Sequence, residues 1–318
     1  MNDTENKHLI LGQINGFDIK PFILSLRKSG YKGDVCFFVS EKNIQKHNYL
    51  RQYGVKLVKS KDEYPFITDI SDVNNILPKL PYNKMAHVCS RFVMYYLYLS
   101  KYGKNYSKVM LTDVRDVIFQ HNPFDFKFNK GLCCFLEDKR VKINTSEINT
   151  KWIREGFGEK VLAEIGHNCI SCAGITIGET SKIMNYLKKM VDYLTQGGGT
   201  SINDQGVHNY LIYTNQLNDL ELFENEKGPV LTLGQTKKGT IHFNNEGLII
   251  NDNGDVFNVI HQYEAHIELF KQFYKKFKLN YRINSIKIRL KNLLRKLDFL
   301  RKLFPPQIKK FVKRRFLE

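Results

Sequence analysis

The chain has 318 residues, of which 42% are hydrophobic and 25% are charged, so it is long enough to bury a substantial core. Its net charge of +17 is concentrated at one end, because residues 275–318 contain 16 Lys or Arg and only Asp298 and Glu318 as acids. The rest of the chain is nearly neutral, which excludes a uniformly basic nucleic-acid-binding protein.

Compartment is indicated by the N-terminus and by cysteine usage. The polar N-terminus lacks the basic-then-apolar pattern of a signal peptide, and no apolar run reaches the roughly 18 residues of a membrane-spanning helix. The 6 cysteines are scattered through apolar segments, and the single CxxC at 169–172 lacks the second pair that a zinc site needs. We therefore expect reduced thiols and a cytoplasmic protein.

Short apolar runs alternate with helical patterns along most of the chain. The predicted strands are 8–16 with its turn, 34–40, 55–60, 108–114, 131–138, 169–178 and 256–263. The predicted helices are 21–30, 82–103, 181–196 and 204–216. This alternation predicts an α/β fold with a parallel or mixed sheet and helices on both faces. Apolar runs such as VCFFV are typical of strands that are buried on both sides.

Two aspartates, Asp113 and Asp116, follow the apolar run KVMLT. In α/β sheets ligands bind beyond the carboxyl ends of the strands, so both side chains should project at that edge. Two carboxylates in such a place can hold a hard divalent cation such as Mg²⁺ or Mn²⁺. The alternative is an ordinary turn in which Asp113 caps the chain and Asp116 pairs with Arg115.

This run resembles the aspartate motif of GT-A glycosyltransferases, with D-x-x-D in place of D-x-D, which leaves open which carboxylate binds the metal directly. The chain is most similar to retaining, lipopolysaccharide-type (family 8-like) α-glycosyltransferases and to their nucleotide-diphospho-sugar transferase relatives. The similarity covers roughly residues 8–270 through several weak motifs in the right order. It implies a GT-A (Rossmann-like) mixed sheet flanked by helices over residues 1–270, with Mn²⁺ or Mg²⁺ and a nucleotide-diphosphate sugar as donor.

Two stretches resemble the donor-binding segments of that family. In NKMAHVCSRF, Lys84 and Arg91 lie two helical turns apart on one face, where two cations could meet a diphosphate. The alternative for them is a solvated basic stripe. By resemblance, Gln13, Ile14 and Asn15 after the first strand are candidates for contacts with the nucleotide base, and the alternative there is a plain turn.

Two further stretches resemble the sugar-binding segments. SCAGITIG is similar to the family's N-A-G-V strand, so Ala173 and Gly174 would let the donor sugar approach the backbone, although Cys172 replaces the usual asparagine. NDQGVHNY supplies Asp204 and Gln205, similar to the D-Q pair at the catalytic face of retaining members. Asp204 could instead be a helix N-cap, and the two roles can coexist.

The stretch VFNVIHQYEAH resembles the strand whose histidine completes the metal site, so His261 is the expected third ligand beside the two aspartates. The basic residue that the family places nearby is missing, since Ala265 stands there, and Lys271 or a tail residue could substitute. Glu137 and Asp138, at the end of GLCCFLED, form another acid pair that could serve on the acceptor side or as a catalytic acid.

The C-terminal region 271–318 is expected to be a basic, membrane-associating helical tail. Apolar residues recur at three- and four-residue steps over 283–304 with Lys and Arg on the other faces, and Pro305–Pro306 ends the pattern. Such amphipathic helices lie in the interface of anionic membranes. The alternatives are a helix packed on the body and, less in keeping with the apolar stripe, a nucleic-acid-binding tail, so no nucleic-acid partner is expected.

Together these features favour a metal-dependent, retaining glycosyltransferase (a hexosyltransferase-type enzyme of class EC 2.4) at the inner face of the cell membrane. It would move a sugar to a glycan or lipid-linked glycan acceptor in surface polysaccharide or glycolipid synthesis. One alternative is a sugar nucleotidyltransferase, but that class normally carries a glycine-rich, basic signature near the N-terminus, and the segment GQINGFD lacks it. The other alternative is a non-catalytic membrane- or nucleic-acid-binding protein. An inverting reaction stays open, because Asp204, Glu137 or Asp138 could act as the carboxylate base.

Overall fold

The protein is described by a computed structural model, which covers residues 7–14, 17–60, 87–196, 203–236 and 240–279. The chain forms two compact units, Met1–His261 and Gln262–Glu318. The first contains a seven-stranded sheet in the order β3-β2-β1-β4-β7-β6-β8. Its strands are β1 His8–Ile14, β2 Asp34–Ser40, β3 Val55–Ser60, β4 Lys108–Thr112, β6 Leu132–Leu136, β7 Ser171–Glu179 and β8 Leu220–Phe223.

The direction of β7 determines which strand ends meet at one edge of this sheet. All neighbouring strands pair in parallel except β7, which is antiparallel to both β4 and β6. The carboxyl ends of β1, β4 and β6 therefore lie at the same edge as the first residues of β7. The expected mixed sheet is confirmed.

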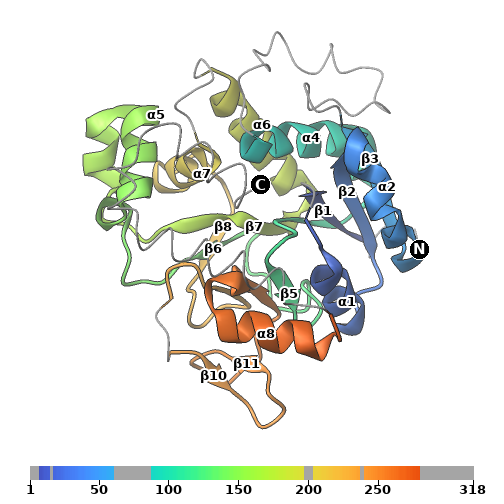
Figure 1. The fold of residues 1–318 in the computed structure, drawn as a ribbon. Coiled ribbons are helices and arrows are strands. Elements are labelled where there is room, and N and C mark those ends of the chain that lie inside the picture. The colour runs from blue at the N-terminus through green and yellow to red at the C-terminus, as the bar shows by residue number, and fades with distance from the viewer. Residues whose placement is uncertain (1–6, 15–16, 61–86, 197–202, 237–239, 280–318) are drawn as a thin grey trace, which may run out of the picture. The chain divides into compact units, whose positions relative to one another are not determined.

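Helices cover both faces of the sheet, as Figure 1 shows. Alternation along β1 divides its side chains between two cores, since Leu9 and Leu11 pack with α4, α6 and α7 whereas Ile10 packs with α1, β5 and β12. The helices of this unit are α1 Lys20–Lys28, α2 Ile44–His47, α4 His87–Tyr102, α5 Glu147–Ile165, α6 Thr180–Gln196 and α7 Asp204–Tyr213. The expected α/β class with helices on both faces is confirmed.

A second, three-stranded sheet has the order β5-β12-β9, and β10 pairs with β11. These strands are β5 Val117–Phe119, β9 Val230–Thr232, β10 His242–Phe243, β11 Ile249–Ile250 and β12 Val259–His261. Antiparallel pairing of β12 with β5 sets His261 opposite Val117, next to Asp116 in the chain. Short 3₁₀ helices occur at η1 Glu41–Asn43, η2 Asn48–Tyr53, η4 Gly103–Asn105 and η5 Ile143–Thr145.

The Gln262–Glu318 unit contains the 3₁₀ turn η6 Tyr263–Ala265 and the helix α8 Ile267–Lys276. The predicted tail helix over 283–304 lies outside the described residues, and the predicted boundary between residues 270 and 271 stays a prediction. None of the helices in the described ranges combines the length and the apolar composition that a membrane span requires.

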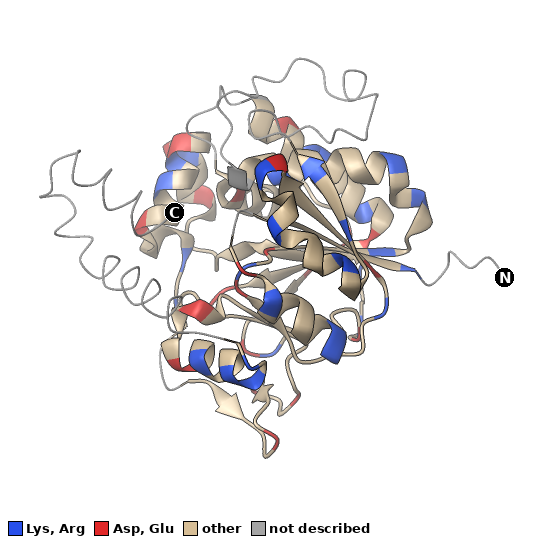
Figure 2. Ribbon diagram, turned by 45° about the vertical axis from the view of Figure 1, so that its right-hand side comes forward, with Lys and Arg blue, Asp and Glu red and all other residues tan. Residues whose placement is uncertain are grey.

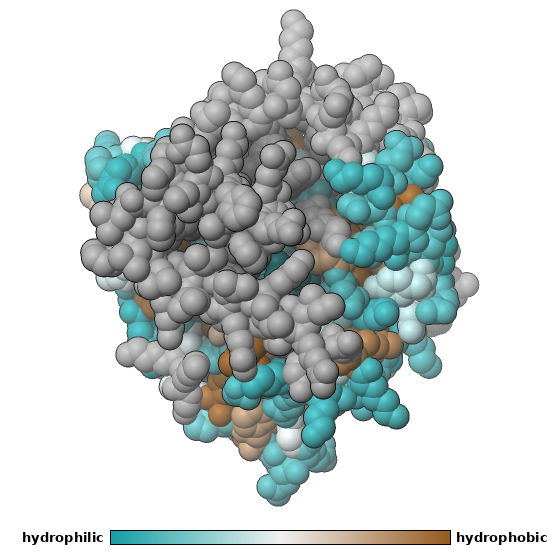
Figure 3. All heavy atoms as spheres, viewed as in Figure 1, coloured by the Kyte–Doolittle hydropathy of each residue, from teal (hydrophilic) through white to brown (hydrophobic). Residues whose placement is uncertain are grey.

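Several elements differ from the sequence-based expectation. The predicted strand over 256–263 is shorter in the structure, where β12 has three residues. The helices and strands that were not predicted are α2, α5, β5, β8, β9, β10, β11 and α8. Basic and acidic residues are interspersed over the helices, in keeping with a nearly neutral body (Figure 2). The described residues on the face drawn in Figure 3 are mainly hydrophilic.

Candidate metal centre and active site

The candidate site begins where β4 ends. Asp113 directly follows β4, and its backbone N–H donates to the carbonyl of Gly174 in the antiparallel neighbour β7, at 2.7 Å. Asp116 directly precedes β5, so a short turn separates the two carboxylates. Because β12 pairs with β5, His261 is brought to the same turn from the far end of the unit.

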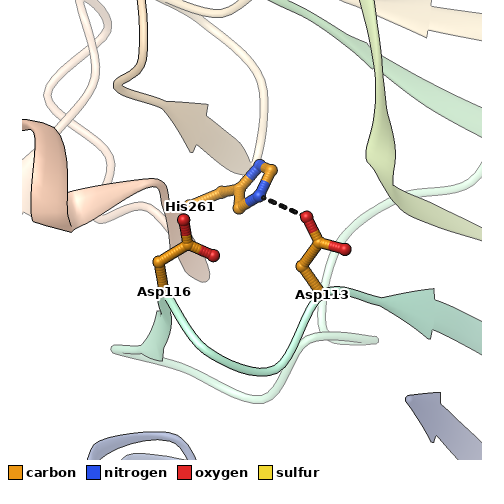
Figure 4. A group of neighbouring side chains, drawn as sticks. All are labelled: Asp113, Asp116 and His261. Atoms are coloured by element: carbon orange, nitrogen blue, oxygen red, sulfur yellow. Dashed lines mark ion pairs between the residues drawn. The ribbon is translucent and has the colours of Figure 1, made fainter. Parts of the chain in front are cut away.

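Asp113, Asp116 and His261 point toward one another (Figure 4), and each offers a ligand atom that lies within 4.8 Å of the other two. His261 Nε2 is 3.4 Å from Asp113 Oδ2. Although the imidazole is fully buried, this nitrogen has no hydrogen-bond partner among the described residues. A buried ring nitrogen that faces carboxylate oxygens without a hydrogen bond fits a metal ligand.

Gly174 provides the space in which these side chains converge. A Cβ atom at this position would lie 2.4 Å from His261 Cε1 and 2.8 Å from Asp113 Oδ2. Any other residue would therefore displace the imidazole or the carboxylate. Two carboxylates and one imidazole are donors that suit Mn²⁺ or Mg²⁺, so the residues present fit such an ion.

Arg91, on α4, joins the metal candidates to α7. Its guanidinium donates to Asp113 Oδ1, to Asp204 Oδ2 at 2.8 Å and to the carbonyl of Ala173 at 3.3 Å. The Arg91 side chain is only 11% exposed, so its charge requires these partners. Arg91 is therefore a fixed cation beside the candidate metal centre, in contrast to a solvated basic stripe.

Electrostatics differ between the two carboxylates that Arg91 contacts. Burial alone would raise the pKa of Asp113, but the Arg91 charge, together with the neighbouring His261 imidazole, outweighs it and holds that pKa below its usual value. Burial also raises the pKa of Asp204, and there the opposing effect of Arg91 is not sufficient to cancel it. Asp113 is therefore the stronger anion of the pair and the better ligand for a cation.

The start of α7 carries the predicted Asp204 and Gln205. The N-cap is Asn203, whose Oδ1 accepts from the Gln205 backbone N–H at 3.0 Å, so the alternative role of Asp204 as N-cap is wrong. The Asp204 carboxylate is buried and turned toward Arg91. Gln205 Nε2 donates to Asn149 Oδ1 at 3.0 Å and lies 3.5 Å from Glu137 Oε1.

The acid pair that follows β6 divides into two roles. Glu137 is buried, and burial raises its pKa to about 7, although His261, Cys172 and Gln205 each oppose the rise. Asp138 is ion-paired with Arg140, whose Nε donates to Asp138 Oδ1 at 2.7 Å. Glu137 therefore faces the candidate site, whereas the ion pair with Arg140 accounts for Asp138.

The remaining residues predicted to bind the donor are not among the side chains that converge at the candidate metal centre in the described part of the chain. Gln13 is half-buried at the end of β1, and the Ile14 side chain belongs to the hydrophobic core, which leaves only its backbone for a ligand. Asn15 and Lys84 lie outside the described residues. Lys271 is ion-paired with Glu268 at 3.0 Å within α8.

Two neighbours of the site were missed by sequence reasoning. Cys172 was noted only as a departure from an asparagine, yet its Sγ lies 3.6 Å from His261 Nδ1. Asn149, on the unpredicted helix α5, contacts Gln205. A hydrophobic pattern does not reveal either contact, because both depend on pairing between distant segments.

No protein-family model matches the sequence, and no curated protein matches it either. Among solved structures, the apo form of mouse xyloside xylosyltransferase 1 is similar to 80% of this chain and 96% of that chain, with 11% sequence identity and a TM-score of 0.43. We therefore infer the function from the residues of the site.

Proposed function

We propose that the protein is a metal-dependent glycosyltransferase of the GT-A type, which transfers a sugar from a nucleotide-diphosphate donor with retention of configuration. The observation that carries this proposal is the convergence of Asp113, Asp116 and His261 at the strand edge, with the buried Arg91–Asp204 pair beside them. Ligands of α/β sheets bind at such an edge.

The chemistry requires positive charge where the diphosphate departs. Asp113, Asp116 and His261 would hold Mn²⁺ or Mg²⁺, which when bound supplies charge that stabilises the leaving diphosphate. Arg91 adds a fixed cation that cannot lose its proton. Its ion pairs keep the guanidinium in place before the donor arrives, so little reorganisation is needed during the reaction.

The sugar would lie against β7 and the start of α7. Ala173 and Gly174 are small, which permits close approach to the backbone. Asp204 is held by Arg91, and Gln205 by Asn149, so both polar groups are oriented before a sugar binds. Such groups can stabilise the oxocarbenium character that develops as the glycosidic bond lengthens.

The acceptor side of the proposal rests on the sequence of the tail. A basic amphipathic pattern over 283–304 favours attachment to the inner face of an anionic membrane and a lipid-linked or other glycan acceptor. Co-sedimentation of the full chain with vesicles of anionic and of zwitterionic lipid tests the attachment. Equal binding to both vesicle types would argue against it.

The metal-dependent donor site is tested by the double substitution of Asp113→Asn and Asp116→Asn. We expect binding of nucleotide-diphosphate sugars to lose its dependence on Mn²⁺, because neutral amides neither attract nor hold the cation as carboxylates do. The measurement is a thermal-shift screen of uridine, guanosine, adenosine and cytidine diphosphate sugars with and without Mn²⁺.

A matched control exists in the same unit. Asp252 and Asp255 have the same spacing but are exposed on a loop, so Asp252→Asn with Asp255→Asn removes the same charge elsewhere. This control should retain Mn²⁺-dependent stabilisation. Undiminished Mn²⁺-dependent donor binding in the Asp113/Asp116 variant would refute the metal assignment.

A further inference from the structure

The imidazole of His261 has two nitrogens with different surroundings. Nε2 faces Asp113 at 3.4 Å, on the side of the candidate metal centre. Nδ1 faces the opposite way, toward Cys172 Sγ at 3.6 Å. Since sulfur is large and its hydrogen bonds are long, this separation is compatible with a weak N–H to sulfur hydrogen bond.

Behind Cys172 lies a buried carboxylate. Cys172 is 2% exposed and Glu137 is 4% exposed. Leu136 pairs with Ser171 and the Glu137 backbone N–H donates to the carbonyl of Ile170 at 2.8 Å, so the two residues lie near each other where the end of β6 meets the start of β7. The thiol also opposes the rise in the pKa of the Glu137 carboxyl group. No Lys or Arg within the described ranges forms an ion pair with Glu137. Gln205 Nε2 lies 3.5 Å from Glu137 Oε1. A buried carboxylate without a cationic partner is costly, so its place needs a physical reason.

The usual surroundings of metal-binding histidines offer a reason for a buried carboxylate at this place. A histidine ligand must be neutral at the metal-facing nitrogen, and its other ring N–H almost always donates to a carboxylate, a carbonyl or a water, which fixes the tautomer and the ring orientation. Here the acceptor next to Nδ1 is a thiol, and the carboxylate is one step further away. If Nδ1–H donates to Sγ and the thiol donates to Glu137, every proton has one donor and one acceptor, and Nε2 keeps a free lone pair.

We propose that Cys172 and Glu137 are positioning residues that hold His261 in the Nδ1–H tautomer, with Nε2 directed at the divalent cation. The inference rests on the proposed metal site and assigns this chain a relay of carboxylate, thiol and imidazole behind the ligand. It also explains how a cysteine can occupy the position at which an asparagine was expected.

The test is direct measurement of Mn²⁺ affinity by electron paramagnetic resonance on the full-length protein without a sugar donor. Cys172→Ala should weaken Mn²⁺ binding about tenfold, the lower end of the roughly 10- to 100-fold loss typical of such supporting partners. Cys172→Ser, which keeps a donor and an acceptor, should restore most of the affinity. Glu137→Leu should weaken binding, and Glu137→Gln should do so less.

Cys133→Ala is the matched control, because Cys133 is also a fully buried thiol on a strand of the same sheet but packs in the core on the α1 face. It should leave the Mn²⁺ affinity within about twofold of that of the unsubstituted protein, whatever stability it loses, because it changes no partner of the metal ligand. Thermal unfolding without metal checks that each variant is folded.

A second readout reports the tautomer itself. In the metal-free, ¹⁵N-histidine-labelled protein, at a pH high enough for the His261 imidazole to be neutral, its resonances should show a protonated Nδ1, and Cys172→Ala should shift them toward a mixture of tautomers. Unchanged Mn²⁺ affinity and an unchanged His261 tautomer in Cys172→Ala would overturn the relay while leaving the metal site intact. If the unsubstituted protein binds no Mn²⁺, the proposed function fails together with the relay.

Discussion

His208 and His261 are both fully buried in the same unit, yet their partners differ completely. His208 Nδ1 is 2.8 Å from the Tyr186 hydroxyl and its Nε2 is 2.9 Å from the Ser171 hydroxyl. Burial, with a smaller contribution from the Arg91 charge, lowers the pKa of His208 to about 3. His208 is thus a neutral imidazole whose two nitrogens are both satisfied, and it joins α6, α7 and β7.

The imidazole of His261, in contrast, is surrounded by acidic side chains. Burial alone would lower its pKa, but Cys172, Asp113 and Asp116 together raise the pKa well above its usual value. Its Nε2 faces oxygens with no hydrogen bond among the described residues. Because the two histidines are equally buried, their different roles must come from their neighbours. Neutral hydroxyl groups satisfy both nitrogens of the structural histidine His208. The carboxylates around His261 favour binding of a cation, either a proton or a metal ion.

The largest expected difference between substitutions of His261 and of His208 is in metal binding. His261→Gln should raise the Kd for Mn²⁺ by at least about a hundredfold, since loss of a ligand costs more than the roughly 10- to 100-fold loss caused by removal of a supporting partner. His208→Gln should leave that Kd unchanged but lower the free energy of unfolding by about 2 kcal/mol, because two buried hydroxyls lose a partner. Calorimetric titration and chemical denaturation measure the two quantities.

The comparison would break if both variants bound Mn²⁺ with similar affinity. A loss of stability in His261→Gln, without any loss of Mn²⁺ binding, would make His261 a second structural histidine. Asp113 and Asp116 would then be an acidic turn, one of the alternatives that the sequence alone leaves open.

A smaller effect on Mn²⁺ binding is expected from substitution of Gly174, which lies against both Asp113 and His261. Gly174→Ala should weaken Mn²⁺ binding about tenfold, because its methyl group would displace the imidazole, and overpacking of this kind costs about 1–3 kcal/mol. Gly178→Ala, in the same strand, is the control. Its Cβ would lie 2.6 Å from the carbonyl oxygen of Gly131, so it should reduce stability without changing the Kd for Mn²⁺.

If the Gly174 variant bound Mn²⁺ like its Gly178 counterpart, the side chains around His261 would not be confined, and the ion would have other ways to bind. Titration of both variants under the same buffer conditions decides between these outcomes, with thermal unfolding as the check that each is folded.

Sequence patterns predicted the parts of the site that local chemistry encodes. The apolar run KVMLT ends at Thr112, as β4 does, so the position of Asp113 at a strand end could be predicted from hydropathy. The buried strands β1, β2 and β7 were predicted for the same reason. Helix α5 was not predicted because its apolar residues show little helical periodicity and because Gly158 interrupts the helix with a φ of +86°.

The contacts that complete the site could not be predicted in this way. His261 reaches Asp116 only because β12 pairs with β5, a strand of three residues with no clear pattern of its own. Arg91 lies 22 residues from Asp113 and 113 residues from Asp204, and no local preference encodes either ion pair. The separation of His208 from His261 also depends on such long-range partners, since each histidine follows an apolar residue in the sequence.

The smallest expected effect, about 1 kcal/mol of unfolding free energy per pH unit, concerns pH in the absence of metal. His208 has a folded-state pKa of about 3 and an ordinary value of 6.5, so below pH 6.5 only the unfolded chain takes up its proton and stability falls with decreasing pH. His261 has a raised folded-state pKa, so its contribution is complete below pH 6.5 and is lost as pH rises through the folded-state value. His208→Gln should therefore flatten the stability profile on the acid side of pH 6.5 and His261→Gln on the alkaline side. Urea denaturation from pH 4 to 9 in the presence of a chelator measures both profiles, and if the two substitutions flattened the same limb, the two imidazoles would not differ in charge as their partners require.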